Sequence, residues 1–279
     1  MPKHRFPSRP RAFVTGAASG FGRAIALDLA ARRGRLVLGD IDDTGLAETA
    51  ELVERRGGEV RTIRCDVRDP DQVEAQVALA DEAFGGVDIG VNNAGVAVAG
   101  PVGDVTLEDW KWQIDINLWG VIYGCHALVP RMKAQGSGWI LNVASAAGIA
   151  SAPTMGPYNV SKAGVISLTE TLCGELMDTG VSASALCPTF FQTNIHTRAR
   201  TTMPHLRDQT AKLITESKWT AAQVAEIALD QLEKGTLYII PQPDARGLWR
   251  AKRALGGRFF QLMGKAMKNP RFMKVLGGE

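Results

Sequence analysis

RAFVTGAASGFG, residues 11–22, joins a short apolar run to a turn that contains three glycines, Gly16, Gly20 and Gly22. Glycine removes side chains where a turn must be tight and where a ligand must come close to the backbone. When such a turn leads into a helix, the free N–H groups and the helix dipole favour a phosphate group. Because the turn follows the first strand-like run of the chain, we interpret it as a dinucleotide-binding turn.

Strand-like and helix-like segments alternate along the rest of the chain. Apolar and β-branched runs predict strands at 11–16, 35–41, 59–67, 87–95, 138–145, 181–189 and 236–241. Helical periodicity predicts helices at 20–33, 44–56, 70–84, 109–135, 158–179 and 220–234, with Thr44, Pro70 and Thr220 as starting residues. This alternation predicts an α/β fold, a Rossmann-type doubly wound parallel sheet of about seven strands in a single domain.

The composition fits an ordinary globular enzyme. Of 279 residues, 45% are hydrophobic and 22% are charged, and no apolar run approaches the ~18–20 residues that span a bilayer. The net charge of +3 is too small to indicate a nucleic-acid partner. Residues 1–10 lack the apolar stretch of a secretory signal, so we expect a flexible arm there, a catalytic domain over 11–243 and an extension over 244–279.

Cysteines and histidines are too scattered to predict disulfides or a metal site. The four cysteines form no C-x-x-C pair, which favours buried, reduced thiols and a cytoplasmic location. The four histidines have no spacing typical of metal ligands. We therefore expect no metal.

An acidic residue ends the second predicted strand. Asp40 lies 24 residues after Gly16, where a carboxylate would accept hydrogen bonds from the adenosine ribose hydroxyls. It would repel a 2′-phosphate, and neither Ser19 nor Ile41 supplies a compensating positive charge. This favours NAD over NADP, although Asp40 could also be an ordinary polar residue at a strand end.

The sequence YNVSK, residues 158–162, places a tyrosine and a lysine four positions apart. On a helix these side chains project from the same face, one turn apart. The pair is either a catalytic acid/base couple or an ordinary Tyr and Lys on a solvated helix, because this spacing also occurs by chance.

Taken together, these motifs resemble the short-chain dehydrogenases/reductases. The shared features are T-G-x-x-x-G-x-G at 15–22, Asp66 at a strand end, NNAG at 92–95, Asn117, Ser145, Tyr158 and Lys162. They occur in the family's order, near its spacing, and cover about residues 11–241. The resemblance implies an alcohol dehydrogenase or ketoreductase that acts on a CH–OH group with NAD or NADP as acceptor.

The resemblance also implies a catalytic tetrad of Asn117, Ser145, Tyr158 and Lys162. Tyr158 would be the general base in alcohol oxidation and the general acid in ketone reduction. The Lys162 ammonium, together with an oxidised nicotinamide, would lower the phenol pKa from ~10 by a few units. Ser145 would donate a hydrogen bond to the substrate oxygen, and Asn117 would bind a water that links Lys162 to solvent.

A set of cofactor contacts follows from the same resemblance. The predicted contacts are Gly16, Ser19, Gly20, Phe21, Gly22, Asp40, Ile41, Asp66, Val67, Asn93, Ala94, Gly95, Tyr158, Lys162, Pro188 and Thr193. Asn92 is expected to be mainly structural. The chain departs from the family at Thr189, which stands where glycine usually follows the proline, and this leaves the local chain path open.

The substrate pocket is expected between segments 96–100, 147–156 and 189–217. The third segment would form a mobile lid with Ile195, Met203 and Leu206. Their small and apolar residues predict a lipophilic secondary alcohol or its ketone as substrate. Arg198 and Arg200 would either meet an anionic substrate group or, more ordinarily, be solvated. The predicted substrate contacts are Val96, Ala147, Phe190 and Phe191.

The sequence leaves two alternative functions to consider. An NADPH-dependent carbonyl reductase would share the tetrad but should carry a basic residue near Ser19 or Asp40, and a non-catalytic dinucleotide sensor should have lost a tetrad member. We see no elements that read nucleic acid. By resemblance, a homodimer or homotetramer would pair through 109–135 and 158–179.

The extension from Asp244 onward has the pattern of a basic amphipathic helix. Its apolar residues recur at helical intervals, from Leu248 to Met267, and most of its cations, up to Lys268, fall on the other side. Such a helix packs on its own domain or a partner subunit, or makes a peripheral membrane contact. Gly256 and Gly257 weaken its continuity. In either arrangement we expect it to close one side of the substrate pocket.

Overall fold

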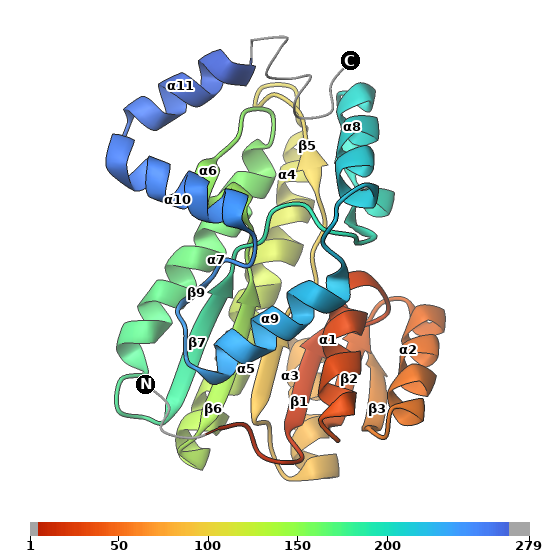
Figure 1. Ribbon diagram of the computed structural model, residues 1–279. Coiled ribbons are helices and arrows are strands. Elements are labelled where there is room, and N and C mark those ends of the chain that lie inside the picture. Colours follow the sequence, from red (N-terminus) through yellow and green to blue (C-terminus); the bar gives the residue numbers. More distant parts are fainter. Residues whose placement is uncertain (1–4, 268–279) are drawn as a thin grey trace.

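The computed structural model describes residues 5–267, which form a parallel sheet with helices on both faces (Figure 1). The strands of this sheet are β1 (Arg11–Thr15), β2 (Arg35–Asp40), β3 (Glu59–Arg64), β4 (Ile89–Asn92), β6 (Gly138–Val143), β7 (Val181–Leu186) and β9 (Tyr238–Ile239). Their order is β3-β2-β1-β4-β6-β7-β9, and every pair is parallel. The predicted seven-stranded, doubly wound sheet is confirmed.

Alternate residues of each strand feed two cores. On one face Ala12 and Val14 pack with α1 (Gly20–Ala31), α2 (Asp43–Arg55) and α9 (Ala221–Glu233). On the other face Phe13 packs with α3 (Pro70–Phe84), α5 (Gly120–Gln135) and α7 (Gly156–Glu175). Strands buried on both faces in this way explain the near-continuous apolar runs of the sequence.

Capping side chains set the helix starts. Pro70 occupies the first turn of α3 behind the N-cap Asp69, and Thr220 forms a capping box with Gln223, so two predicted starts are confirmed. The predicted start at Thr44 is wrong, because the Asp42 side chain accepts from the N–H of Gly45 at 3.1 Å and the helix begins at Asp43.

The helix predicted over 109–135 begins earlier and is interrupted. Thr106 caps α4 (Leu107–Ile114), a π-helical turn η1 (Asp115–Trp119) follows, and α5 continues the run. π-Turns inside α-helices are rare and frequently mark functional sites. This one contains Asn117.

The predicted lid, 189–217, has more regular structure than its sequence indicates. It contains η2 (Ile195–Arg198), β8 (Arg200–Thr201) and α8 (Pro204–Thr215), while the side chain of Leu206 lies outside the description. Strand β8 pairs with β5 (Val98–Ala99) in a separate two-stranded sheet, which fastens the lid to the segment after β4.

Both chain ends that the structure describes contact the body. The Phe6 N–H donates to Glu233 at 2.9 Å and the Phe6 ring meets Trp139 edge to face, so the flexible arm predicted over 1–10 is corrected from Phe6 onward. The extension forms α10 (Pro243–Leu255) and α11 (Arg258–Met267), which separate at Gly256, where φ is +53°. Its remainder from Lys268 lies outside the described residues.

Within 5–267 no helix has the length and apolar character to cross a bilayer.

Candidate active site

The glycine-rich turn between β1 and α1 requires its glycines for two different reasons. Gly16 and Gly20 have φ of +65° and +55°, a left-handed conformation that disfavours other residues. A Cβ atom added at Gly22 would overlap the backbone oxygen of Gly16. Ser19 and Phe21 flank the start of α1, so the predicted residues 16–22 lie together around one helix N-terminus.

The segment after β4 is tied to this turn. The Asn93 side-chain amide donates to the carbonyls of Thr15 and Gly16 at 2.8 and 3.0 Å, and the Ala94 N–H donates to the Thr15 hydroxyl at 3.1 Å. Asn92 is buried and donates to Asn142 at 2.8 Å, in agreement with the structural role expected for it. These hydrogen bonds fix the glycine-rich turn against the segment that follows β4.

Asp40 is joined to the same turn. Its carboxylate accepts from the N–H groups of Ala18 and Asp42 at 2.9 and 3.1 Å, while Ile41 beside it is exposed. Further along, Asp66 pairs with Arg68 at 2.5 Å, which lowers the Asp66 pKa, and Val67 is buried. The predicted adenosine contacts therefore line adjacent strand ends.

Two arginines that the sequence does not place near Asp40 approach this end of the site. Arg64 donates to the Ile41 carbonyl at 2.5 Å and to Asp43 at 3.0 Å. Arg198, from the lid, lies 3.5 Å from Asp42. The folded chain therefore brings two guanidinium groups close to the residues that follow Asp40. The expectation that this region lacks positive charge is wrong.

Three tetrad members meet at the carboxyl ends of β6 and β7. Tyr158 and Lys162 lie one turn apart on α7, with the Lys162 ammonium 5.8 Å from the Tyr158 ring centroid and donating to the Val143 carbonyl at 2.7 Å. The Ser145 hydroxyl accepts from the Ala147 N–H at 3.1 Å, so its own proton is available for donation.

Burial dominates the titration of this cluster. It raises the pKa of the Tyr158 phenol, while the Ser145 hydroxyl acts in the opposite direction. Burial also lowers the pKa of Lys162 to about 8. In the chain without a nicotinamide, desolvation is the larger effect on the phenol pKa, and the joint effect expected of Lys162 and an oxidised nicotinamide stays a prediction.

Asn117 uses its side chain to hold the backbone of Val96. Its amide group donates to the Val96 carbonyl at 2.9 Å, and its oxygen accepts from the Val96 N–H at 2.8 Å. A Cβ atom added at Gly95 would lie 3.4 Å from the Asn117 oxygen and 3.6 Å from the Lys162 ammonium. Asn117, Gly95 and Lys162 thus surround one small volume.

The lid lies over the cofactor turn. A Cβ atom at Gly20 would lie 3.8 Å from Thr193, and the Phe191 ring packs edge to face on Phe21 with centroids 5.5 Å apart. Phe191, a predicted substrate contact, therefore contacts the cofactor turn. The Arg200 side chain is 43% exposed, as expected for a solvated arginine, and it also pairs with Asp109 at 2.8 Å and stacks on Trp112.

The departure at Thr189 has a local explanation. Thr189 has no positive φ, so glycine is not required there, and its N–H donates to the buried Gln242 side chain at 3.2 Å. The Pro188 carbonyl accepts from Ala146, the residue after Ser145, at 2.9 Å. Gln242, the N-cap residue of α10, thus links the start of that helix to the wall of the active site.

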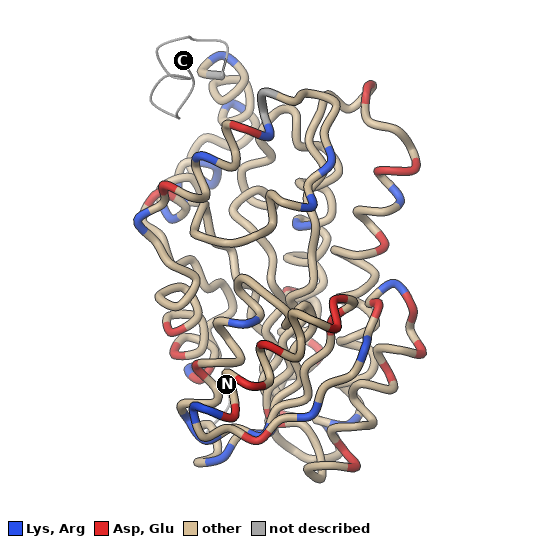
Figure 2. Tube along the Cα trace, turned by 90° about the vertical axis from the view of Figure 1, so that its right-hand side faces the viewer, with Lys and Arg blue, Asp and Glu red and all other residues tan. Residues whose placement is uncertain are grey.

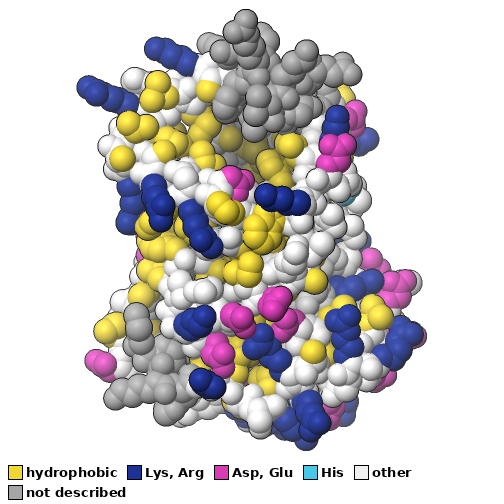
Figure 3. All heavy atoms as spheres, in the orientation of Figure 1, with side chains coloured by type: hydrophobic (Ala, Val, Ile, Leu, Met, Phe, Trp, Pro, Cys, Tyr) yellow, Lys and Arg dark blue, Asp and Glu magenta, His cyan; other side chains and the backbone are white. Residues whose placement is uncertain are grey.

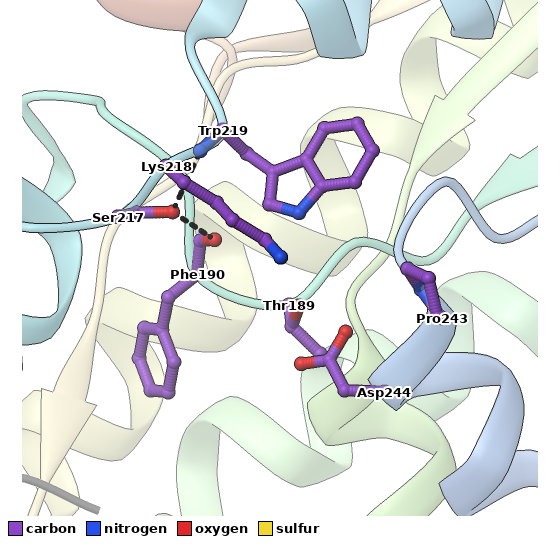
Figure 4. A pocket seen from close by; sticks show the side chains of 7 residues that line it. All are labelled: Thr189, Phe190, Ser217, Lys218, Trp219, Pro243 and Asp244. Carbon is purple, nitrogen blue, oxygen red and sulfur yellow. Dashed lines mark hydrogen bonds between the residues drawn. The ribbon is translucent and has the colours of Figure 1, made fainter.

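A cavity of about 380 Å³ opens beside this wall (Figure 4). The Lys218 ammonium and the Asp244 carboxylate extend toward the space between them, next to Phe190 and Trp219 (Figure 4). Its lining residues are Thr189, Phe190, Ser217, Lys218, Trp219, Pro243 and Asp244. The lid and the start of the extension therefore share one cavity.

Metal ligands do not gather in the described part of the chain. Among residues 5–267, no three His, Cys, Asp or Glu side chains are arranged to hold a metal ion. The four cysteines are free thiols, and burial raises the pKa of Cys65, Cys125 and Cys187 to about 12.

Comparisons with known proteins agree with this geometry. Residues 10–204 match the family described as short chain dehydrogenase. The 2-(R)-hydroxypropyl-CoM dehydrogenase of Xanthobacter autotrophicus is 35% identical over 82% of this chain and 93% of that protein. The 3beta-hydroxysteroid dehydrogenase 1 of Eggerthella lenta is 35% identical over 78% and 86%. A short chain dehydrogenase/reductase from Burkholderia phymatum, solved in complex with NAD, superposes with a TM-score of 0.85 at 35% identity, covering 88% and 94%.

Proposed function

The chain belongs to the short-chain dehydrogenase family, and we propose that it interconverts a lipophilic secondary alcohol and its ketone with NAD(H) as cofactor. Members of this family are oxidoreductases that act on alcohol- or ketone-type substrates with a nicotinamide dinucleotide. The observation that carries the proposal is the meeting of Ser145, Tyr158 and Lys162 beside the glycine-rich turn.

Ser145, Tyr158 and Lys162 each have one task in the proposed reaction. During oxidation, the Ser145 hydroxyl donates a hydrogen bond to the substrate oxygen, where negative charge develops. The Tyr158 phenolate removes the hydroxyl proton, and the Lys162 ammonium stabilises that phenolate. A bound oxidised nicotinamide supplies the hydride acceptor and a second positive charge, which offsets the effect of burial on Tyr158. Reduction reverses these transfers.

The lining of the site supports a lipophilic substrate. Gly100 bridges to Met155, and the Arg200 N–H donates to the Ala97 carbonyl at 3.0 Å, so the three segments predicted to form the pocket meet. Phe190 and the small residues around Ala147 give this wall apolar surface. A panel of alcohols and ketones, assayed by nicotinamide absorbance with each cofactor, tests the proposal. Preference for short polar alcohols would contradict it.

The cofactor preference depends on the charge of Asp40. We expect NAD(H) to be used at least about tenfold more efficiently than NADP(H), equivalent to ~1.4 kcal/mol. Asp40→Ala should narrow this gap, since it removes the charge that repels a 2′-phosphate. Because Asp40 also accepts two backbone hydrogen bonds, Asp40→Asn is the conservative variant. Equal kcat/KM for both cofactors in the unaltered enzyme would show that this reading of Asp40 is wrong.

Arg64 and Arg198 favour a second candidate, an NADPH-dependent carbonyl reductase. Both guanidinium groups approach the residues that follow Asp40 and could pair with a 2′-phosphate. In that case Arg64→Gln combined with Arg198→Gln would raise KM for NADP(H) and leave KM for NAD(H) unchanged. Under the first proposal the double variant should alter both cofactors equally or not at all.

Exposed apolar residues support pairing of two chains through α5 and α7. Trp119, just before α5, and Val160, on α7, are 45% and 51% exposed. We expect a homodimer or homotetramer in solution, and Trp119→Gln should weaken it. Light scattering measures the mass, with Met177→Gln, an equally exposed position after α7, as control. A monomeric unaltered protein would contradict this arrangement.

A further inference from the structure

Positive charge is concentrated in the C-terminal extension, residues 244–279. This segment has nine basic and two acidic residues, a formal charge of +7, whereas residues 1–243 have 23 basic and 27 acidic residues, a formal charge of −4. In the sheet-containing body both signs of charge are interspersed (Figure 2). So uneven a distribution favours an anionic partner for the extension.

The cations of α10 and α11 are not neutralised by the protein's own carboxylates. Arg246 donates to the Ile240 carbonyl at 2.8 Å and Lys252 to the Ile149 carbonyl at 2.7 Å, so the partners of both are neutral groups. Across residues 5–267, no acidic side chain lies within 4.0 Å of the cations of these helices, Arg246, Arg250, Lys252, Arg253, Arg258 and Lys265.

Apolar side chains are exposed among these cations. Phe259 is only 6% exposed, but Leu255, Phe260 and Leu262 are 42%, 39% and 54% exposed. Figure 3 shows apolar and basic side chains mixed over the region of α10 and α11. Large apolar residues flanked by Lys and Arg are typical of helices that lie in a membrane interface.

The same end of the molecule contains other exposed apolar residues close to the site. β5 and α11 lie at that end in Figure 1, and Val102 and Leu107, in the segment after β5, are both exposed. A Cβ atom added at Gly156, at the start of the helix that carries Tyr158, would lie 2.9 Å from Val102. The exposed apolar surface therefore extends to the neighbourhood of the catalytic helix.

We propose that α10 and α11 dock this enzyme on the surface of an anionic lipid bilayer. The cations face the headgroups and the exposed apolar residues enter the boundary of the acyl region. A bilayer fits this surface better than a second copy of the chain does, because charged residues are depleted from the centres of protein interfaces. Docking is independent of the reaction, although it places the active site beside a reservoir of lipophilic alcohols and ketones.

Vesicle sedimentation of the full-length protein tests the proposal. We expect binding to vesicles of phosphatidylcholine mixed with phosphatidylserine, weakened by salt, and little binding to phosphatidylcholine alone. Arg258→Gln combined with Lys265→Gln should weaken binding by about fivefold for each cation removed. Leu262→Asp should weaken it further, and since that side chain is half exposed, the fold should be kept.

Matched variants elsewhere on the surface serve as controls. Met177→Asp changes an apolar residue that is 60% exposed beyond the far end of α7, and Arg55→Gln removes a cation of α2. Both should leave vesicle binding and activity unchanged. Activity on a water-soluble alcohol should also be unchanged in the α11 variants, which separates docking from catalysis.

Two outcomes would overturn the proposal. One is failure of the unaltered protein to sediment with anionic vesicles at low salt. The other is a change of molecular mass by light scattering in the α11 variants without a change of vesicle binding, which would assign the surface to a second copy of the chain.

Discussion

Tyr158→Phe is expected to lower kcat by ~10²–10⁴ while leaving the Kd for NAD nearly unchanged. The substitution removes only the phenol oxygen that takes and returns the proton. The turn proposed to bind the dinucleotide contains other residues, Gly16, Gly20 and Gly22, and is braced by Asn93. Steady-state turnover and NADH fluorescence titration on the same preparation measure the two quantities.

Tyr123→Phe is the matched control for this prediction. Tyr123 lies on α5 against Trp119, with ring centroids 5.6 Å apart. Its variant should keep full turnover. If Tyr158→Phe turned over at a rate close to that of the unaltered enzyme, the proposed acid/base role would have to be abandoned.

Gly22→Ala should weaken dinucleotide binding by about 10- to 100-fold. The added Cβ atom would overlap the Gly16 backbone oxygen and approach the Asn93 amide to 2.6 Å, so the turn itself must move. Overpacking of this kind costs about 1–3 kcal/mol, and here the displacement falls on the groups that approach the pyrophosphate. Isothermal titration with NAD measures the effect.

Gly174→Ala makes the same chemical change where there is room. Gly174 lies in α7, and a Cβ atom there would meet nothing within 4 Å. This variant should bind NAD normally and gain up to about 1 kcal/mol of stability. Unchanged NAD binding in both variants would mean that the turn does not contact the cofactor. Circular dichroism checks that Gly22→Ala stays folded.

The sequence predicts most of the sheet because its signals are local. The start of α3 follows from Asp69 and Pro70 and its end from Gly85, whereas the strand predicted over 87–95 shortens to Ile89–Asn92 because the chain then bends toward the glycine turn. The sequence does not predict helix α8, because its short amphipathic pattern lies in a segment whose composition is typical of a loop.

The site is predictable where motifs are compact and unpredictable where distant residues meet. The spacing of Tyr158 and Lys162 places them on one helix face, and the family pattern is what marks both of them, together with Ser145, as candidates for catalysis. No local signal shows that Arg198 reaches Asp42, 156 residues earlier, or that Gln242 holds Thr189. The desolvation that raises the Tyr158 pKa is likewise a property of the packed structure, so residue spacing could not reveal it.

The bonds that the extension makes to the active-site wall affect the order of folding. Gln242 accepts from Thr189, 53 residues earlier, and Lys252 donates to Ile149, 103 residues earlier. Contacts between such distant segments close late, because the intervening chain must first be ordered. The cofactor turn, built from β1, α1 and β4, needs none of these residues. A refolding chain should therefore regain NAD binding before it regains turnover, and the lag should lengthen in Lys252→Met. If NAD binding and turnover recovered at the same time, the contacts of Gln242 and Lys252 would form as early as the sheet does.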